Sequence, residues 1–328
     1  MVYTTARAET EPFRKPDQLV QQVIDNMEKV IVGKRSVIEF CITALIARGH
    51  VLLEDVPGVG KTLLVRTLAK SLACQFKRIQ FTPDLLPSDV TGMAIYNQRI
   101  VDFEFRPGPI FTQILLADEI NRTSPKTQSA LLEALEEKSV TADGITYSLP
   151  TPFFVLATQN PIEHEGTFSL PEAQLDRFLM KLSIGYPTPD EEIQVLRRGA
   201  TGISIDHLEA VATSEDIERW QDEASLVMVE DSIYAYVVKI VTQTRHHPQI
   251  YLGVSTRGAV ALTKAAQAYA YIHGRDYVIP DDVKLLAPRV LSHRMMMEAD
   301  ATYQGISLAA IMTDILATVP VPVLPQRR

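Results

Sequence analysis

Residues 51–68 read VLLEDVPGVGKTLLVRTL and set the architecture of the chain. They begin with a short apolar run typical of a buried strand, pass through a turn with two glycines, and continue as an apolar helix. Such glycines let backbone amides converge on an anion at the start of a helix, and here a lysine and a threonine follow directly. The stretch therefore predicts a phosphate-binding loop between a parallel strand and a helix.

Each residue type in this loop has an expected role. Gly58 and Gly60 let the backbone approach the phosphates. Lys61 reaches the β and γ oxygens of a nucleotide, and the Thr62 hydroxyl supplies one ligand to Mg²⁺. The strict GxxxxGK[ST] pattern has glycine at position 55, whereas this chain has Asp55. We expect the nucleotide to be contacted by Asp55, Pro57, Gly58, Val59, Gly60, Lys61, Thr62 and Leu63.

Two further apolar runs, Ile114–Ala117 and Phe153–Ala157, are typical of buried parallel strands, and polar residues follow each. The carboxyl ends of parallel strands meet at one edge of a sheet, so these residues are expected beside the phosphate loop. Asp118 would bind Mg²⁺ and Glu119 would polarise the attacking water. Asn160 would hydrogen-bond the water or the γ-phosphate, with a simple Asx turn as the alternative. No NKxD-type segment follows the third strand, so ATP is the expected nucleotide.

Two arginines are candidates for a functional role, and no local acidic motif explains the first of them, Arg177. Arg177 lies just before the last strand-like segment of the α/β part, and Arg257 lies near the start of a predicted helix. The helix dipole opposes a cation at that end, which favours a functional role for Arg257. For Arg177, a surface ion pair is the alternative.

The pattern of the sequence changes after Ile184. Residues 185–189, GYPTP, predict a linker, and Thr188 with Glu191 predicts a capping box at the start of a helix. Helical periodicity then continues, without convincing strand alternation beyond about residue 230. The predicted organisation is a flexible N-terminus at residues 1–16, an α/β domain at 17–185 and a helical domain at 186–328.

Charge and composition narrow the class of protein. The chain has 32 Lys and Arg against 40 Asp and Glu, so it has no general attraction to phosphate backbones and we expect no nucleic-acid partner. Cys41 and Cys74 lack metal-ligand spacing and are expected to be buried bystanders. The N-terminus lacks the apolar core of a signal peptide, and charges or prolines interrupt the longest apolar runs. We expect a cytoplasmic protein with no transmembrane segment.

Taken in order, these motifs resemble the MoxR family of AAA+ ATPases over about residues 15–320. The most specific pieces are DEINRTSPKTQSALLEALEE at 118–137 and LPEAQLDRF at 170–178. The resemblance implies an α/β P-loop NTPase (AAA+) domain with a parallel sheet, followed by an all-helical lid. It also implies a helix-2 insert facing a pore at about residues 82–110, for which an ordinary surface hairpin is the alternative.

The same resemblance assigns roles to seven residues outside the loop. They are Asp118 and Glu119 (Walker B), Asn160 (sensor 1), Arg177 (arginine finger), Arg257 (sensor 2), and Val32 and Gly33 (the segment that lines the adenine). The implied cofactors are ATP and Mg²⁺. An arginine finger works only when a neighbouring subunit brings it to the phosphate, so catalysis would require assembly.

The resemblance further implies a homo-oligomeric ring, expected to be hexameric, that remodels or matures a protein client beside a von Willebrand A-domain partner. A magnesium-chelatase-like motor subunit is the alternative among enzymes, and the compact C-terminal bundle favours MoxR. A DNA-acting AAA+ motor is the alternative from another class, and the acidic balance counts against it. A scaffold without turnover would have lost Glu119 or Arg177, and both are present. The client, the partner's identity, the ring size and the pathway stay open.

Overall fold

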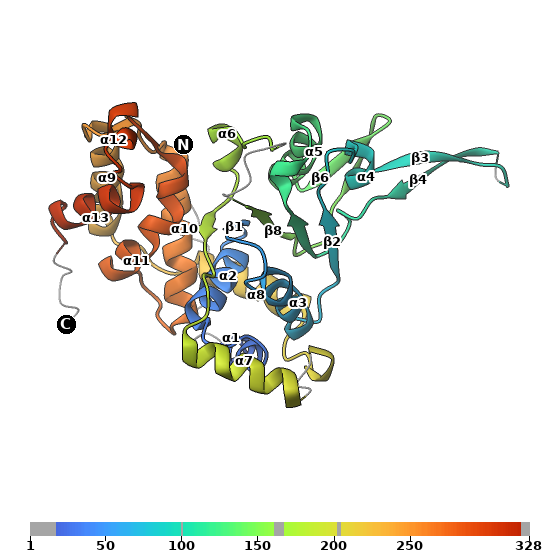
Figure 1. Cartoon of the computed structure of the whole chain (residues 1–328), viewed down its shortest axis with the longest axis horizontal. Coiled ribbons are helices and arrows are strands. Elements are labelled where there is room, and N and C mark those ends of the chain that lie inside the picture. The colour runs from blue at the N-terminus through green and yellow to red at the C-terminus, as the bar shows by residue number, and fades with distance from the viewer. Residues whose placement is uncertain (1–17, 100, 161–166, 202–204, 323–328) are drawn as a thin grey trace, which may run out of the picture.

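The computed structural model describes residues 18–99, 101–160, 167–201 and 205–322. The predicted flexible N-terminus at 1–16 lies outside these residues. Figure 1 shows an α/β body between a helical lid on one side and a long two-stranded arm on the other. The predicted fold class, a parallel-sheet domain followed by a helical lid, is confirmed.

The body is built on a five-stranded parallel sheet in the order β2-β5-β8-β1-β9. Its strands are β1 (Val51–Glu54), β2 (Phe76–Gln80), β5 (Ile114–Asp118), β8 (Phe154–Gln159) and β9 (Met180–Leu182). The three strands expected from apolar runs are β1, β5 and β8, and all three are confirmed. They lie inside the sheet, whereas β2 and β9 form its two edges.

Helices cover both faces of this sheet. The helical elements of the body are α1 (Gln18–Glu28), α2 (Arg35–Ile46), α3 (Lys61–Ser71), α4 (Pro87–Thr91), the 3-10 turn η1 (Ile120–Arg122), α5 (Pro125–Glu137) and α6 (Glu172–Leu175). Val51 and Leu53 pack into a core shared with α1, α2, α3 and the lid, whereas Leu52 packs on the other face with Leu131 and Leu135 of α5. Burial on both faces explains why the central strands read as continuous apolar runs.

A buried histidine fixes α5 against the amino ends of two strands. The His50 Nδ1 accepts a hydrogen bond from the Val155 amide at 3.1 Å, so Nε2 carries the proton and donates to the Leu135 carbonyl at 3.2 Å. Complete burial lowers the pKa of His50 to about 4, so the ring stays neutral near pH 7. The carboxyl-terminal half of α5 therefore lies near the amino ends of β1 and β8.

Two hairpins extend the body. One is the arm of β3 (Gly92–Asn97) and β4 (Asp102–Pro107), and the other pairs β6 (Ser139–Ala142) with β7 (Ile145–Ser148). The arm and α4 lie within the insert predicted at 82–110, and in Figure 1 the arm reaches far from the sheet. Phe105 of the arm stacks on Tyr147 of β7 with ring centroids 4.0 Å apart, which joins the two hairpins at the base of the arm.

The lid contains most of the remaining helices. The elements that follow β9 are α7 (Pro189–Thr201), η2 (Ile205–His207), α8 (Ser214–Ser225), α9 (Asp231–His246), β10 (Ile250–Leu252), α10 (Thr256–Ile272), α11 (Pro280–Leu291), η3 (Ser292–Arg294), β11 (Met296–Met297), α12 (Ala299–Tyr303) and α13 (Leu308–Thr318), and Figure 1 shows α7 beside α1 of the body. The short antiparallel pair β10–β11 was not expected beyond residue 230. The Thr188–Glu191 capping box is present: the Thr188 amide donates to the Glu191 carboxylate at 2.8 Å, and the Glu191 amide donates to the Thr188 hydroxyl at 3.3 Å.

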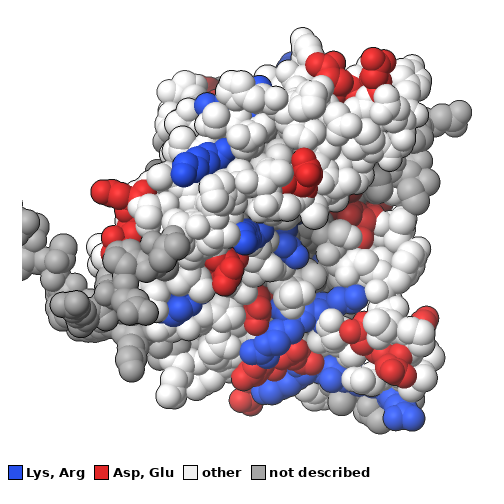
Figure 2. Space-filling model, turned by 90° about the vertical axis from the view of Figure 1, so that its left-hand side faces the viewer, with Lys and Arg blue, Asp and Glu red and all other residues white. Residues whose placement is uncertain are grey.

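The lid packs directly on α2 of the body. The Phe40 ring of α2 stacks with Tyr269 of α10, and the Arg289 guanidinium of α11 lies 4.1 Å from the centre of the same ring. On the lid side of the molecule, shown in Figure 2, Lys and Arg lie among Asp and Glu rather than in a continuous basic stripe. Among the described residues, no helix is both long and apolar enough to cross a bilayer.

Candidate active site

The phosphate loop has the backbone conformation that its glycines were expected to provide. Gly58 and Gly60 have φ angles of +88° and +92°, a region that side-chain-bearing residues rarely adopt, and the space in front of both α-carbons is open. Lys61 opens α3 and its Nζ donates to the Asp55 carbonyl at 2.7 Å, which holds the lysine across the loop. The loop can therefore present backbone amides, a lysine and the start of a helix to an anion.

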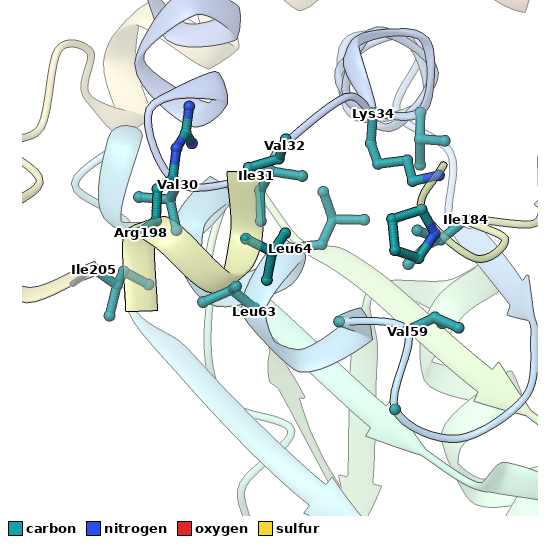
Figure 3. A pocket seen from close by; sticks show the side chains of 15 residues that line it. Val30, Ile31, Val32, Lys34, Val59, Leu63, Leu64, Ile184, Arg198 and Ile205 are labelled. Carbon is teal, nitrogen blue, oxygen red and sulfur yellow. The ribbon is translucent and has the colours of Figure 1, made fainter. Parts of the chain in front are cut away.

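A cavity of about 500 Å³ adjoins the loop. Figure 3 shows side chains entering it from the segment after α1, from the loop, from α3 and from the segments around α7. It is lined by Val30, Ile31, Val32, Lys34, Val37, Gly58, Val59, Gly60, Leu63, Leu64, Ile184, Pro187, Val195, Arg198 and Ile205. Its mostly apolar wall beside an anion-binding loop fits a purine next to its phosphates.

The segment predicted to line the adenine lies at this cavity. Val32 is part of the wall. Gly33 has a φ of +68°, and a β-carbon there would overlap the Glu191 side chain of α7. Lys34, the next residue, pairs with the Glu191 carboxylate at 3.7 Å. The glycine therefore allows α7 to close against this segment.

The Asp55 side chain hydrogen-bonds to the segment that follows β9. One carboxylate oxygen accepts hydrogen bonds from the Ser183 hydroxyl at 2.8 Å and the Gly185 amide at 3.2 Å, and the other accepts from the Ile184 amide at 2.5 Å. The residue is 7% exposed. The Asp55 carboxylate holds the chain that leaves β9, and its carbonyl accepts from Lys61, so its expected contact with the nucleotide stays a prediction.

We predict that Asp55→Ala destabilises the chain by about 1–3 kcal/mol, because the Ile184 and Gly185 amides would be left buried or half-buried without their acceptor. Urea unfolding followed by fluorescence measures this free energy. Glu133→Ala, which removes an exposed carboxylate of α5, is the control and should change the midpoint little. Equal midpoints for the two variants would contradict the structural role of Asp55.

Both predicted Walker B acids lie at the carboxyl end of β5. Asp118 is 7% exposed, and its Oδ1 accepts from the Thr158 hydroxyl of β8 at 2.5 Å. Glu119 has a φ of +59°, and its amide donates to the same hydroxyl at 2.8 Å. Asn160 is buried and directly follows β8. The three residues thus lie at the carboxyl ends of the neighbouring strands β5 and β8, and β8 in turn pairs with β1, as predicted from the parallel strands.

Three residues of the strands that flank β5 contact these acids and were not singled out in the sequence. Arg78 Nη2 donates to Asp118 Oδ2 at 2.7 Å, and Gln80 Nε2 donates to Glu119 Oε2 at 2.6 Å. Both belong to β2, two residues apart, and thus point to the same side of the edge strand. Thr158 is the third. The sequence of β2, FKRIQ, has no clear alternation that would have located Arg78 and Gln80.

The residues present fit a magnesium–nucleotide complex. Carboxylate and hydroxyl oxygens are the ligands that Mg²⁺ prefers, and Asp118 and Thr62 offer one of each at the carboxyl edge of the sheet. The open loop glycines and Lys61 fit the phosphates, and the apolar cavity fits the base.

The two predicted arginines come together away from the phosphate loop. Arg177 Nη2 lies 3.4 Å from one carboxylate oxygen of Glu136, and Arg257 Nη2 lies 3.3 Å from the other. Arg177 Nη1 also donates to the Leu132 carbonyl at 2.5 Å. Glu136 and Leu132 belong to the last part of α5, so the lid and the body each contribute one arginine to the same carboxylate.

A third arginine fixes this region of the lid to the body. Arg294 is 7% exposed, and it donates to Asp176 Oδ1 at 2.6 Å and to the Phe178 carbonyl at 2.7 Å. Burial lowers the pKa of Arg294, and the nearby Asp176 carboxylate opposes that shift. Arg257 also reaches Asp176, at 3.5 Å. Arg294 therefore fixes Asp176, and the carboxylate helps to place Arg257. The sequence around Arg294 gave no sign of this role.

Known proteins resemble the chain over nearly its whole length. Residues 50–180 match the model of an ATPase family associated with various cellular activities (AAA), and residues 242–315 match an AAA lid domain. The chain is 59% identical to the uncharacterized protein YeaC of Bacillus subtilis, over 93% of this chain and 95% of that protein. It is 42% identical to Chaperone MoxR1 of Mycobacterium tuberculosis, over 92% and 82%. The crystal structure of a proposed ATPase from Cytophaga hutchinsonii matches with a TM-score of 0.87 and 41% identity, over 93% and 96%.

Proposed function

This chain belongs to the MoxR family of AAA+ ATPases, and we propose that it hydrolyses ATP as a ring of its own copies and uses that turnover to remodel or mature a protein client. One arrangement carries this function. The phosphate loop follows Glu54 at the end of β1, and the two acids lie at the end of β5, so loop and acids share the carboxyl edge of the sheet. Arg177 precedes β9, whose Met180 pairs with Val51, the first residue of β1. Arg177 is therefore near the end of β1 opposite its own phosphate loop, where it could serve the site of a neighbouring copy.

The chain's own residues divide the chemistry. Lys61 would bind the β and γ oxygens, and Thr62 with Asp118 would hold Mg²⁺, which supplies neutralising charge for phosphoryl transfer. Glu119 would orient and deprotonate the attacking water, and Asn160 would fix that water or the γ-phosphate. Arg177 and Arg257, both partly exposed and both beside Glu136, would enter the neighbouring subunit's site. A head-to-tail contact of this kind can repeat until it closes into a ring. We propose a ring of six copies.

We propose that the arm of β3 and β4 faces the ring pore and meets the client. Five exposed apolar side chains support a protein-contacting role for it: Met93, Ile95, Tyr96, Val101 and Phe103. The name of the relative Chaperone MoxR1 agrees with a protein client and favours this function over a chelatase motor. A von Willebrand A-domain partner, a cytoplasmic location and the absence of a nucleic-acid partner are parts of the same proposal.

Lys61→Ala tests the nucleotide site. A charge-assisted hydrogen bond is worth about 1.5–3 kcal/mol, so we expect ATP affinity to fall by about tenfold to a hundredfold or more. Titration with a fluorescent ATP analogue measures the affinity, and particle-mass measurements with ATP follow assembly. The control is Lys70→Ala on the same helix, because Lys70 donates to the Asp206 carbonyl, away from the loop. Unchanged ATP binding by Lys61→Ala would refute the loop assignment, and full ATPase activity by monomers would refute the ring.

A further inference from the structure

Both oxygens of Asp118 already have partners, and one of these partners is a cation. Thr158 donates to Oδ1 at 2.5 Å. Arg78 donates to Oδ2 through two nitrogens, Nη2 at 2.7 Å and Nε at 3.1 Å. A guanidinium thus forms a double contact with the carboxylate that fits the magnesium of the proposed nucleotide site.

This contact follows from the register of two neighbouring strands. Gln80 of β2 lies opposite Asp118 of β5, and Arg78 lies opposite Leu116. The long side chain of Arg78, two residues before the partner of Asp118, spans this offset and reaches the carboxylate. Lys77, the adjacent cation, points to the other side of β2. The strand therefore places only one of its two neighbouring cations on Asp118.

Arg78 can leave Asp118 without disturbing a core. Its side chain is 46% exposed, whereas that of Asp118 is 10% exposed. Arg78 belongs to β2, the edge strand of the sheet, so its guanidinium can turn toward solvent or toward an anion at the carboxyl edge. A fixed carboxylate and a movable cation are what a replaceable counter-ion requires.

We propose that Arg78 is a resident counter-ion of the nucleotide site, which balances Asp118 before Mg²⁺ arrives and supplies positive charge to metal-free phosphates. Arg78 has opposite effects on the binding of ATP with Mg²⁺ and on the binding of ATP without it. The guanidinium competes with Mg²⁺ for Asp118, and it also attracts the phosphates when no metal is present. Both effects reduce the factor by which Mg²⁺ tightens ATP binding. This inference rests on the proposed nucleotide site.

The test compares ATP affinity in EDTA with ATP affinity in Mg²⁺, using a fluorescent ATP analogue and no turnover. In Arg78→Gln, we expect Mg²⁺ to tighten binding by a factor about tenfold larger than in the wild-type chain, a change in the range of one charge-assisted hydrogen bond. Arg78→Met, a second neutral variant, should behave alike. Arg78→Lys keeps the charge and should stay near the wild-type factor. Thermal unfolding without nucleotide shows whether each variant is folded.

Lys77→Gln is the matched control, because it removes the same charge from the same strand without a contact to Asp118. A factor that stays at the wild-type value in both neutral Arg78 variants would overturn the inference, since a merely structural arginine changes both affinities alike. An equal increase in Lys77→Gln, or an Arg78→Lys chain that behaves like Arg78→Gln, would overturn it too. A wild-type chain that binds no ATP with Mg²⁺ would instead remove the nucleotide site itself.

Discussion

A Glu119→Gln chain is expected to bind ATP about as tightly as the wild-type chain and to hydrolyse it at least about a hundredfold more slowly, a loss typical for removal of a positioned base. Glu119 directly follows Asp118 at the end of β5, and its carboxylate contacts Gln80 and, at 3.4 Å, Arg122. A glutamine keeps the size of the side chain but cannot accept a proton from water. Binding depends on the loop and on Lys61, which the change leaves intact.

Equilibrium titration and steady-state phosphate release measure the two effects separately. Glu137→Gln is the control, because Glu137 is an exposed residue of α5 and no role is assigned to it. Hydrolysis near the wild-type rate would exclude Glu119 as the base, and lost ATP binding would mean that the variant damages the site. A chain that binds without turnover should also hold its client on the ring, so tagged Glu119→Gln with ATP is the means to identify that client.

The elements around the phosphate loop could be predicted because the polar residues of the site directly follow their strands in the sequence. Each of β1, β5 and β8 is a buried apolar run followed directly by polar residues, and parallel pairing brings those ends to one edge. The edge strand β2 gave no such signal. Its sequence FKRIQ has two adjacent cations and no continuous apolar run, and its polar side chains reach the site only through pairing with β5. Arg78 and Gln80 were therefore missed.

Roles that depend on contacts between distant residues could not be read from the sequence. Asp55 occupies a motif position, and the role of its carboxylate depends on the chain at 183–185, more than a hundred residues away. The resemblance assigns a role to Arg177 and to Arg257, but their shared partner Glu136 became visible only when the lid was placed against α5. The β6–β7 hairpin was missed because its strands, SVTA and ITYS, are mostly exposed or half-buried and contain no continuous apolar run.

Arg177→Ala is expected to lower the ATPase rate by about 10³-fold to 10⁵-fold while ATP binding stays, because an arginine that stabilises the transferring phosphoryl group is worth that much. The side chain is only 27% exposed and donates to the Leu132 carbonyl, so the fold of the variant has to be checked by thermal unfolding. Arg177 comes before β9, and the phosphate loop follows the opposite end of the neighbouring strand β1, so Arg177 does not lie beside its own phosphate site. A neighbouring copy must then provide it.

Mixing two inactive chains tests this directly. In an Arg177→Ala chain the phosphate site is intact, and in a Lys61→Ala chain the finger is intact. In rings assembled from equal amounts, about a quarter of the head-to-tail interfaces pair an intact site with an intact finger, so part of the wild-type activity should return. A chain carrying both changes is the control, because every interface in its rings lacks both an intact site and an intact finger. Co-assembly without any gain in activity would show that Arg177 does not act across the interface. Catalysis would then give no argument for a ring.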